Sequence, residues 1–286
     1  NFKNLNSVGK NTENFKSSPQ VELISLLNIN SSIPLVKNTK YFTNYLTPKA
    51  SFKLNPSDMK DKSSSSKSIN VGNIFDNNRL GFNDTFESGK SLTLGLDFRK
   101  EKKNDLEEIN KYFELKLATV LRDKEEDLIP KKSTINRKNS NLFGSISNNF
   151  SDNFNLSYNF ALDNNYKNFE YNNLSATISF NNLSSTFNFI EENGEMGDSN
   201  VLENIIGYKF DESNYLSFNT RRNRKLNLTE YYNLVYEYKN DCLTAGIKYK
   251  KSYYEDRDLK PTENFLFTIT LFPLTTYEHD AQDLFN

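Results

Sequence analysis

The sequence predicts an all-β chain that forms an antiparallel transmembrane β-barrel, and three observations lead to this prediction. First, about thirteen segments of roughly ten residues alternate between apolar and polar side chains, as tilted membrane-crossing strands do. Second, short turns and long loops follow one another, so the long loops gather at one end of the sheet. Third, no apolar run approaches the roughly 18 residues of a membrane helix, and no helical period of comparable length competes.

Composition narrows the class of protein before any motif is considered. The chain has 286 residues and a formal net charge of -1, which gives no support for nucleic-acid binding. Aromatic residues make up 14% of it, and a disordered chain would contain far fewer. Its single cysteine and single histidine cannot form an internal disulfide or a multi-histidine metal site. Since nucleophile elbows and phosphate loops are also missing from the sequence, we expect no enzyme and no cofactor.

The sequence pattern of the first 54 residues predicts a polar end followed by two strands. Residues 1–19 are polar and without a period, and we expect a loop or a frayed end there. Two runs, 20–30 and 44–54, place apolar side chains at every second position, which is the period of a strand. Pro48 weakens the second prediction, because proline cannot donate to a sheet ladder.

A long polar segment, residues 55–88, separates these strands from the next one. Loops of this length are either functional or disordered. The first half contains the run SSSSK at residues 63–67, and we expect it to be disordered. The second half carries Ile74, Phe75 and Leu80, which give it enough apolar surface to fold onto another part of the protein.

The rest of the chain repeats the alternating design up to a polar tail, residues 275–286. In the last predicted strand, Phe265 and Phe267 share one face, while Thr268 and Thr270 share the other. The remaining predicted strands cover residues 90–100, 109–122, 141–149, 155–163, 169–181, 184–191, 201–210, 215–222, 230–239, 242–252 and 263–273.

A soluble antiparallel sandwich also alternates, with its apolar face turned inward. The segment length, close to the 9–11 residues of a tilted membrane strand, and the asymmetry of the connections favour the membrane barrel. A spanning sheet must close to satisfy every backbone group. An odd number of strands without a closing partner therefore indicates one half of a larger barrel, which we expect not to fold alone, because it would expose two unpaired edges.

Three stretches resemble the family of the lipopolysaccharide (LPS) assembly protein LptD, also called OstA. They are YLTPKASFKLNPSDM at residues 45–59, NIFDNNRLGFNDTFESGKSLTLGLDF at residues 73–98, and TEYYNLVYEYKNDCLTAGIKYKKSYYEDRDLKPTENFLFTITLFPL at residues 229–274. The individual motifs are degenerate, but they keep the order of the family. The resemblance implies a transmembrane barrel of about twenty-six strands in the outer membrane of a Gram-negative bacterium.

In this reading, residues 20–274 are the C-terminal half of the barrel, residues 55–88 are a long extracellular loop, and residues 275–286 are a periplasmic tail. The resemblance further implies an LptE-like plug lipoprotein inside the barrel and insertion by the barrel-assembly machinery. An LptA-like periplasmic bridge would deliver LPS through an N-terminal domain that lies outside these residues. The lipid would leave by a lateral gate between the first and last strands.

Three sites are carried over from the family, and the first two lie near the end of the chain. Cys242, which follows a short turn, matches a cysteine that the resemblance places in a disulfide to the N-terminal domain; the alternative is a buried free cysteine. The last predicted strand would form one side of the lateral gate, although it is an ordinary lipid-facing strand in either case. The gate residues are Asn264, Phe265, Leu266, Phe267, Thr268, Ile269, Thr270, Leu271 and Phe272.

The third site from the family, a patch in the long loop, and a separate basic cluster complete the candidate sites. Arg79, Gly81 and Asp84 would anchor the long loop in or over the lumen, with Gly81 permitting a tight turn; the alternative is a solvated loop. A basic cluster near an outward loop could contact lipid phosphates, or it could simply be solvated. The cluster consists of Arg221, Arg222, Arg224 and Lys225.

The sequence therefore predicts an outer-membrane translocon component that assembles LPS in the outer leaflet. A general diffusion porin or other uptake barrel is the first alternative, and it would keep a closed seam and a constricting charged loop. A soluble all-β surface protein with a structural or adhesive role is the second.

Overall fold

The chain is all-β in the computed structural model, which describes residues 2–7, 20–102, 112–151, 153–253, 261–271 and 275–280. None of the described helices has the length and apolar content needed to cross a membrane. The elements are β1 (Phe2–Ser7), β2 (Gln20–Ser25), β3 (Leu27–Ser32), β4 (Leu35–Asn38), β5 (Phe42–Asn55), β6 (Gly89–Lys102), β7 (Tyr112–Arg122), η1 (Lys131–Ser133), β8 (Leu142–Ser151), β9 (Phe154–Leu162), β10 (Phe169–Phe180), β11 (Leu183–Glu192), η2 (Gly194–Met196), β12 (Ser199–Lys209), β13 (Asn214–Asn223), β14 (Leu228–Lys239), β15 (Leu243–Ser252), β16 (Thr262–Leu271) and β17 (Thr275–Asp280).

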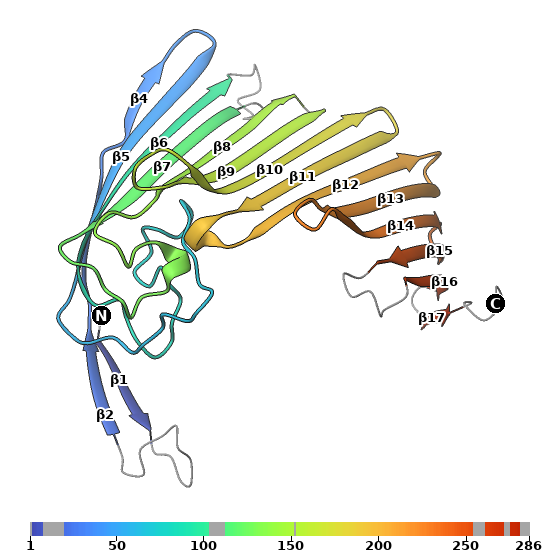
Figure 1. The fold of residues 1–286 in the computed structure, drawn as a ribbon. Helices are drawn as coiled ribbons and strands as arrows, with labels where there is room; N and C mark the ends of the chain where they lie inside the picture. Colours follow the sequence, from blue (N-terminus) through green and yellow to red (C-terminus); the bar gives the residue numbers. More distant parts are fainter. Residues whose placement is uncertain are drawn as a thin grey trace. The chain divides into compact units, whose positions relative to one another are not determined.

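The strands are hydrogen-bonded in nearly sequential order. A 15-stranded sheet runs from β17 back to β5 without a crossover and then to β3, while β4 pairs with β5 beside it. From β5 to β17, each strand therefore lies next to its neighbour in the sequence, as Figure 1 shows for successive strands. β1 and β2 form a separate two-stranded sheet. The pairs whose registers are resolved, from β3–β5 to β16–β17, are antiparallel, so the predicted antiparallel fold is confirmed.

The chain divides into two compact units, which are described separately below. Strands β8, β9 and β10 contribute residues to both. Unit 1 comprises Asn1–Ile146, Asn159–Tyr171 and Asn193–Gly197, and unit 2 comprises Ser147–Tyr158, Asn172–Glu192 and Asp198–Asn286.

Within the described residues, the predicted alternating segments coincide with strands, and the differences lie at the two ends of the chain. The predicted run 20–30 is two strands, divided at Leu26, whose side chain is buried. β1 lies inside residues 1–19, where a loop was expected, and β17 lies inside the predicted polar tail. β4 was not predicted, because four residues are too few for a period to be recognised.

Pro48 is accommodated inside β5 because its nitrogen, which has no hydrogen to donate, faces the gap between β3 and β4. The carbonyl of Pro48 accepts a hydrogen bond from the N–H of Ile33 at 3.1 Å, so its backbone polar side faces the β3–β4 segment. β3 ends at Ser32 and β4 begins at Leu35, which leaves this position between two short strands. A proline is tolerated where the ladder is already interrupted.

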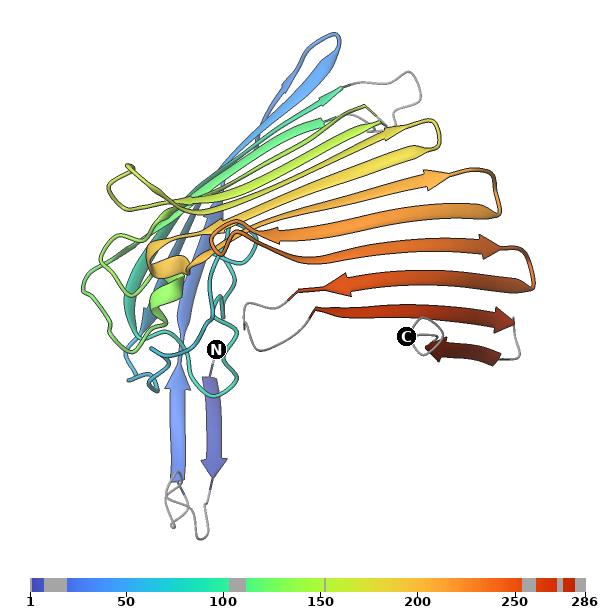
Figure 2. The same cartoon turned by 45° about the vertical axis from the view of Figure 1, so that its right-hand side comes forward.

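The antiparallel order places every second connection at the same end of the sheet. In unit 1, the β5–β6 loop (residues 56–88) and the β7–β8 loop (residues 123–141) lie at the same end of the sheet, where Figure 2 shows them gathered. In unit 2, the turns 210–213 and 240–242 share one end, while the β13–β14 connection lies at the other.

Candidate functional site on the polar face of the sheet

In unit 1 the sheet buries its polar face and exposes its apolar face. On the polar face, Ser51 of β5 and its partner Thr93 of β6 are both 0% exposed. On the other face, Phe52 and its partner Leu92 are each 38% exposed, and Leu94 is 41% exposed. A soluble sheet with one solvated face has the reverse arrangement. In the described part of unit 1, protein therefore covers the polar face and leaves the apolar face open.

The β5–β6 loop supplies this cover. The ring of Phe75 lies directly over Gly95 in β6, and a Cβ atom at Gly95 would come within 2.6 Å of it. Glycine is thus the residue that allows the loop to approach the strand so closely. The loop is also tied to β5, because Lys53 Nζ donates a hydrogen bond to the carbonyl of Asp76.

A small apolar core joins this loop to the β7–β8 loop. Met59 and Ile69 of the first loop are at most 4% exposed and belong to one cluster with Ile129 and Ile135 of the second, both 0% exposed. The prediction that the first half of the β5–β6 loop is disordered is therefore wrong. This half is rich in serine, and two of its few apolar residues, Met59 and Ile69, contact other apolar residues only when the chain is folded.

Arg79, Glu87 and Arg122 form a buried ion cluster beneath the β5–β6 loop. Arg79 makes a bidentate pair with Glu87, with Nε to Oε2 at 2.7 Å and Nη2 to Oε1 at 2.5 Å. Arg79 also donates to the hydroxyl groups of Thr93 at 2.9 Å and Ser91 at 3.1 Å. Arg122 Nη1 pairs with the same Glu87 oxygen, Oε1. The three charged side chains are at most 9% exposed, so the cluster is shielded from solvent.

Electrostatics explain why the carboxylate stays ionised in this buried place. Burial alone would raise the pKa of Glu87, but the guanidinium groups of Arg79 and Arg122 and the ammonium group of Lys53 outweigh burial and lower the pKa to about 2. Glu87 precedes β6 and Arg122 ends β7, so the cluster fastens the β5–β6 loop to the polar face at that end of both strands.

The three residues expected to anchor this loop together are placed differently. Asp84 does not pair with Arg79; it pairs with Lys62 at 3.0 Å and is 41% exposed. Gly81 has a φ of 66°, a left-handed conformation that favours glycine, and its N–H donates to the carbonyl of Asn78 at 2.9 Å in a turn. The expectation that Arg79 and Asp84 anchor the loop together is therefore corrected. Arg79 binds residues of β6, whereas Asp84 binds a lysine of the same loop.

Glu87 and Arg122, which complete the cluster, were not singled out by the sequence. Both stand where a polar loop meets a strand, and Arg122 shares a face with Val120, which is 0% exposed. A charged residue at the end of a strand, on the face that also carries buried apolar residues, is the sequence feature that points to Arg122.

In unit 2 the polar face carries a relay of side-chain hydrogen bonds across neighbouring strands. Ser175 Oγ donates to Asn188 Oδ1 at 2.7 Å. Asn188 Nδ2 and the hydroxyl of Tyr231 both donate to Glu203, at 3.3 and 2.9 Å. This face therefore presents linked donors and acceptors rather than apolar surface.

The opposite face of unit 2 is apolar and open. Ile206, Leu234 and Ile269 on three different strands are 41%, 41% and 44% exposed. In β14 the exposed positions alternate strictly with less exposed ones around Leu234, which is the period of a strand with two different faces. Both units thus share the same inverted distribution of polar and apolar side chains.

Cys242 is exposed and free, in the turn between β14 and β15. The Asn240 side chain shapes this turn, because its Oδ1 accepts from the N–H groups of Cys242 at 3.0 Å and Leu243 at 2.8 Å. The alternative of a buried cysteine is therefore wrong. The turn lies at the same end of unit 2 as the turn 210–213, opposite the β13–β14 connection.

The expected gate strand is not the last strand of the described chain. β16 covers Thr262–Leu271 and pairs on one side with β15 and on the other with β17. The prediction of residues 264–272 as the terminal strand is corrected, because Thr275–Asp280 adds one more strand to the sheet. Phe272 lies outside the described residues.

The predicted basic cluster lies at the end of β13 and in the connection after it, with a register shift in the β13–β14 pairing between Arg221 and Arg222. Each of its four side chains has a partner within unit 2. Arg221 pairs with Glu230 at 2.7 Å, Arg222 donates to Asn227 at 2.5 Å, Lys225 pairs with Asp198, and the guanidinium of Arg224 lies 5.8 Å from the centre of the Phe189 ring.

Comparison with protein families gives one match that covers most of the chain. The family model described as LptD, LPS transport system D, matches residues 3–193. Comparison with curated proteins gives no match.

Comparison with solved structures finds porins. A triple mutant of the Rhodopseudomonas blastica porin is 10% identical, with 97% of this chain and 90% of the porin covered and a TM-score of 0.39. A double mutant of the same porin is 11% identical, with the same coverage and TM-score. The family match, and not these likenesses, is the basis for identification.

Proposed function

The chain belongs to the LptD family, LPS transport system D, and from this premise we propose that it forms part of an outer-membrane β-barrel that passes lipopolysaccharide to the outer leaflet. The observation that supports this proposal most is the inverted sheet. Phe52 and Leu94 in unit 1, and Leu234 in unit 2, lie on open apolar faces, whereas Ser51 and Thr93 are buried on the polar face. Lipid on one side and a polar lumen on the other account for this distribution.

In the proposed mechanism the polar face hosts the sugar portion of the lipid. The hydrogen-bond relay that ends at Glu203 and Tyr231 offers donors and acceptors to the sugar hydroxyls as the lipid moves over the polar face. The acyl chains would leave through a gap between the first and last strands of the barrel. For this chain, the gate strand that we propose is β17 rather than β16, because β17 is the last strand in the hydrogen-bonded order of the described residues. Transport by this route is passive and requires no catalytic group here.

The long-loop end of the sheet would face the cell exterior, as in other outer-membrane barrels. The β5–β6 loop, fastened by Arg79, Glu87 and Arg122, then lies on the lumen side of the barrel wall at that end. The remaining partners follow from the family alone. They are an LptE-like plug, an LptA-like periplasmic bridge and the barrel-assembly machinery.

A diffusion porin is the main alternative, and depletion in the host cell distinguishes the two functions. We expect depletion of this protein to reduce newly made LPS at the cell surface, measured with a hydrophilic label, while uptake of small solutes stays unchanged. Loss of solute uptake with normal surface LPS would support a porin instead.

We also propose that Cys242, exposed in its turn, bridges to the N-terminal domain. If so, complementation with Cys242→Ser abolishes the mobility shift that reduction causes for the wild type on gels; identical mobility of both proteins would exclude the bridge.

A further inference from the structure

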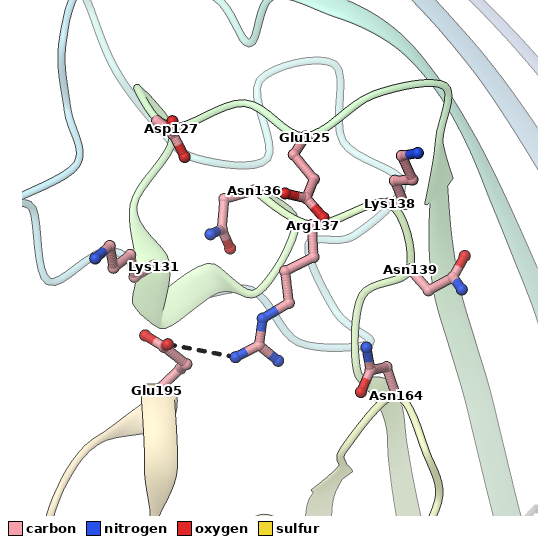
Figure 3. Close-up of a pocket in the computed structure, with 9 residues that line it drawn as sticks. All are labelled: Glu125, Asp127, Lys131, Asn136, Arg137, Lys138, Asn139, Asn164 and Glu195. Carbon is pink, nitrogen blue, oxygen red and sulfur yellow. Dashed lines mark ion pairs between the residues drawn. The ribbon is translucent and has the colours of Figure 1, made fainter.

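A polar pocket of about 400 Å³ lies among the loops of unit 1 and shares none of its lining residues with the ion cluster. Figure 3 shows its lining side chains, which come from the β7–β8 loop with η1, from the β9–β10 turn and from η2. These connections all lie at the long-loop end of the sheet, which the proposed function assigns to the cell exterior. The pocket therefore stands where a surface molecule or an emerging lipid could reach it.

The chemistry of the lining restricts the ligand. Three carboxylates, three cations and three asparagines line the pocket, and no apolar side chain does. Pockets for apolar ligands are lined mainly by hydrophobic and aromatic residues, so an apolar ligand is disfavoured. Balanced charges disfavour a simple anion or cation. Among the described residues, no group of three or more metal-ligating side chains is arranged to hold a metal ion.

The pocket is formed before any ligand arrives. Arg137 Nη2 lies 3.4 Å from Glu195 Oε1, so an ion pair connects the β7–β8 loop with η2 (Figure 3). The carbonyl of Asn136 accepts from the N–H of Glu126 at 2.8 Å, which closes the loop on itself. Ile135, next to Asn136, is 0% exposed in the apolar core. A site held in this way loses little freedom on binding.

One acceptor in the wall has no partner. The side-chain oxygen Oδ1 of Asn136 is buried and receives no hydrogen bond within the described part of the chain. Nearly all buried polar atoms in proteins are hydrogen-bonded, and an exception calls for a partner from water or a ligand. A hydroxyl group can supply that hydrogen, and it can accept one from a neighbouring amide or cation.

We infer that this pocket is a saccharide-binding subsite, in which hydroxyl groups of a sugar bond to Asn136 and its amide neighbours while the paired charges accommodate ionised substituents. This inference rests on the proposed function only for the origin of the sugar. The glycan of the exported lipid and an unrelated surface glycan share the same chemistry, and the experiment below separates them.

The test measures binding of released LPS oligosaccharide, freed from its lipid, to the full-length protein in detergent. Saturation-transfer NMR and calorimetry are run with this oligosaccharide and with a neutral dextran oligosaccharide. Asn136→Ala should weaken binding about three- to tenfold, the effect of one lost neutral hydrogen bond. Asn139→Ala, at an exposed lining position, provides a second variant that leaves the buried wall intact. Asn182→Ala, in an exposed turn of unit 2, is the matched control and should bind as the wild type does.

Each outcome decides the matter. Binding that both pocket variants weaken places the sugar in the pocket. If only the LPS oligosaccharide binds there, the site serves the exported lipid, and if both sugars bind there, it serves glycans in general. Absence of binding by the wild type, or equal binding by the wild type and both pocket variants, overturns the inference. Since surface LPS after depletion is measured separately, loss of this inference leaves the proposed function standing.

Discussion

Replacement of Glu87 by alanine is expected to destabilise the folded protein by about 3–5 kcal/mol, because it leaves two buried guanidinium groups without their carboxylate. The side chains of Arg79 and Arg122 are 1% and 0% exposed, so water cannot compensate for the loss. The midpoint of heat-induced unfolding, followed by the mobility shift of the folded barrel on gels, should fall accordingly. Trypsin should also cut the β5–β6 loop faster in this variant, since the cluster fastens that loop to β7.

Two further variants make this result specific. Glu212 lies in the exposed turn after β12, and Glu212→Ala should leave both the unfolding midpoint and the cleavage rate unchanged. Glu87→Gln keeps a hydrogen-bond acceptor without the charge and should fall between the wild type and Glu87→Ala. If Glu87→Ala and Glu212→Ala unfold at the same temperature, the cluster does not fasten the loop.

Replacement of Leu234 by lysine is expected to cost about 2–4 kcal/mol in a bilayer, since a lysine near the midplane of a barrel's lipid face carries this penalty. Leu234 is 41% exposed and lies near the middle of β14. In a soluble protein the same surface substitution would change stability by about 0.5 kcal/mol or less. Unfolding of the protein in lipid vesicles by urea measures the difference.

Ser217→Lys is the matched control, because Ser217 lies on the polar face at a neighbouring position of β13, opposite Val235. This variant should insert and unfold like the wild type if the polar face borders a lumen. A small effect of Leu234→Lys together with a large effect of Ser217→Lys would reverse the assignment of the two faces.

The sequence predicted the strands well because a strand's period is local. The run 242–252 became β15 (Leu243–Ser252), and the run 169–181 became β10 (Phe169–Phe180), each within about one residue. β17 was missed because its residues, TTYEHD, lack an apolar alternation, and only pairing with β16 reveals it as a strand.

The candidate site was harder to predict because its interactions join residues that lie far apart in the sequence. Arg79 was recognised as an anchor, but its partner Glu87 and the second cation Arg122 are set by how the β5–β6 loop folds over β6 and β7. Nothing in the spacing of these residues distinguishes Glu87 from Asp84 as the partner. Met59 was likewise hidden in a serine-rich stretch, because composition does not record which few apolar residues become buried.

The central claim, that LPS passes along the polar face of this sheet, is tested most directly by photo-crosslinking at two adjacent positions of β14. Glu237 is paired with Gly246 on the polar face, whereas Tyr236 is paired with Ile247 on the apolar face and is 37% exposed. Both lie close to the turn at Asn240, at the opposite end of β14 from the β13–β14 connection. With a photoreactive residue at each position in living cells, we expect an LPS adduct at position 237 and none at position 236. An LPS adduct at position 236 alone, or at neither position in a correctly assembled protein, would contradict the account.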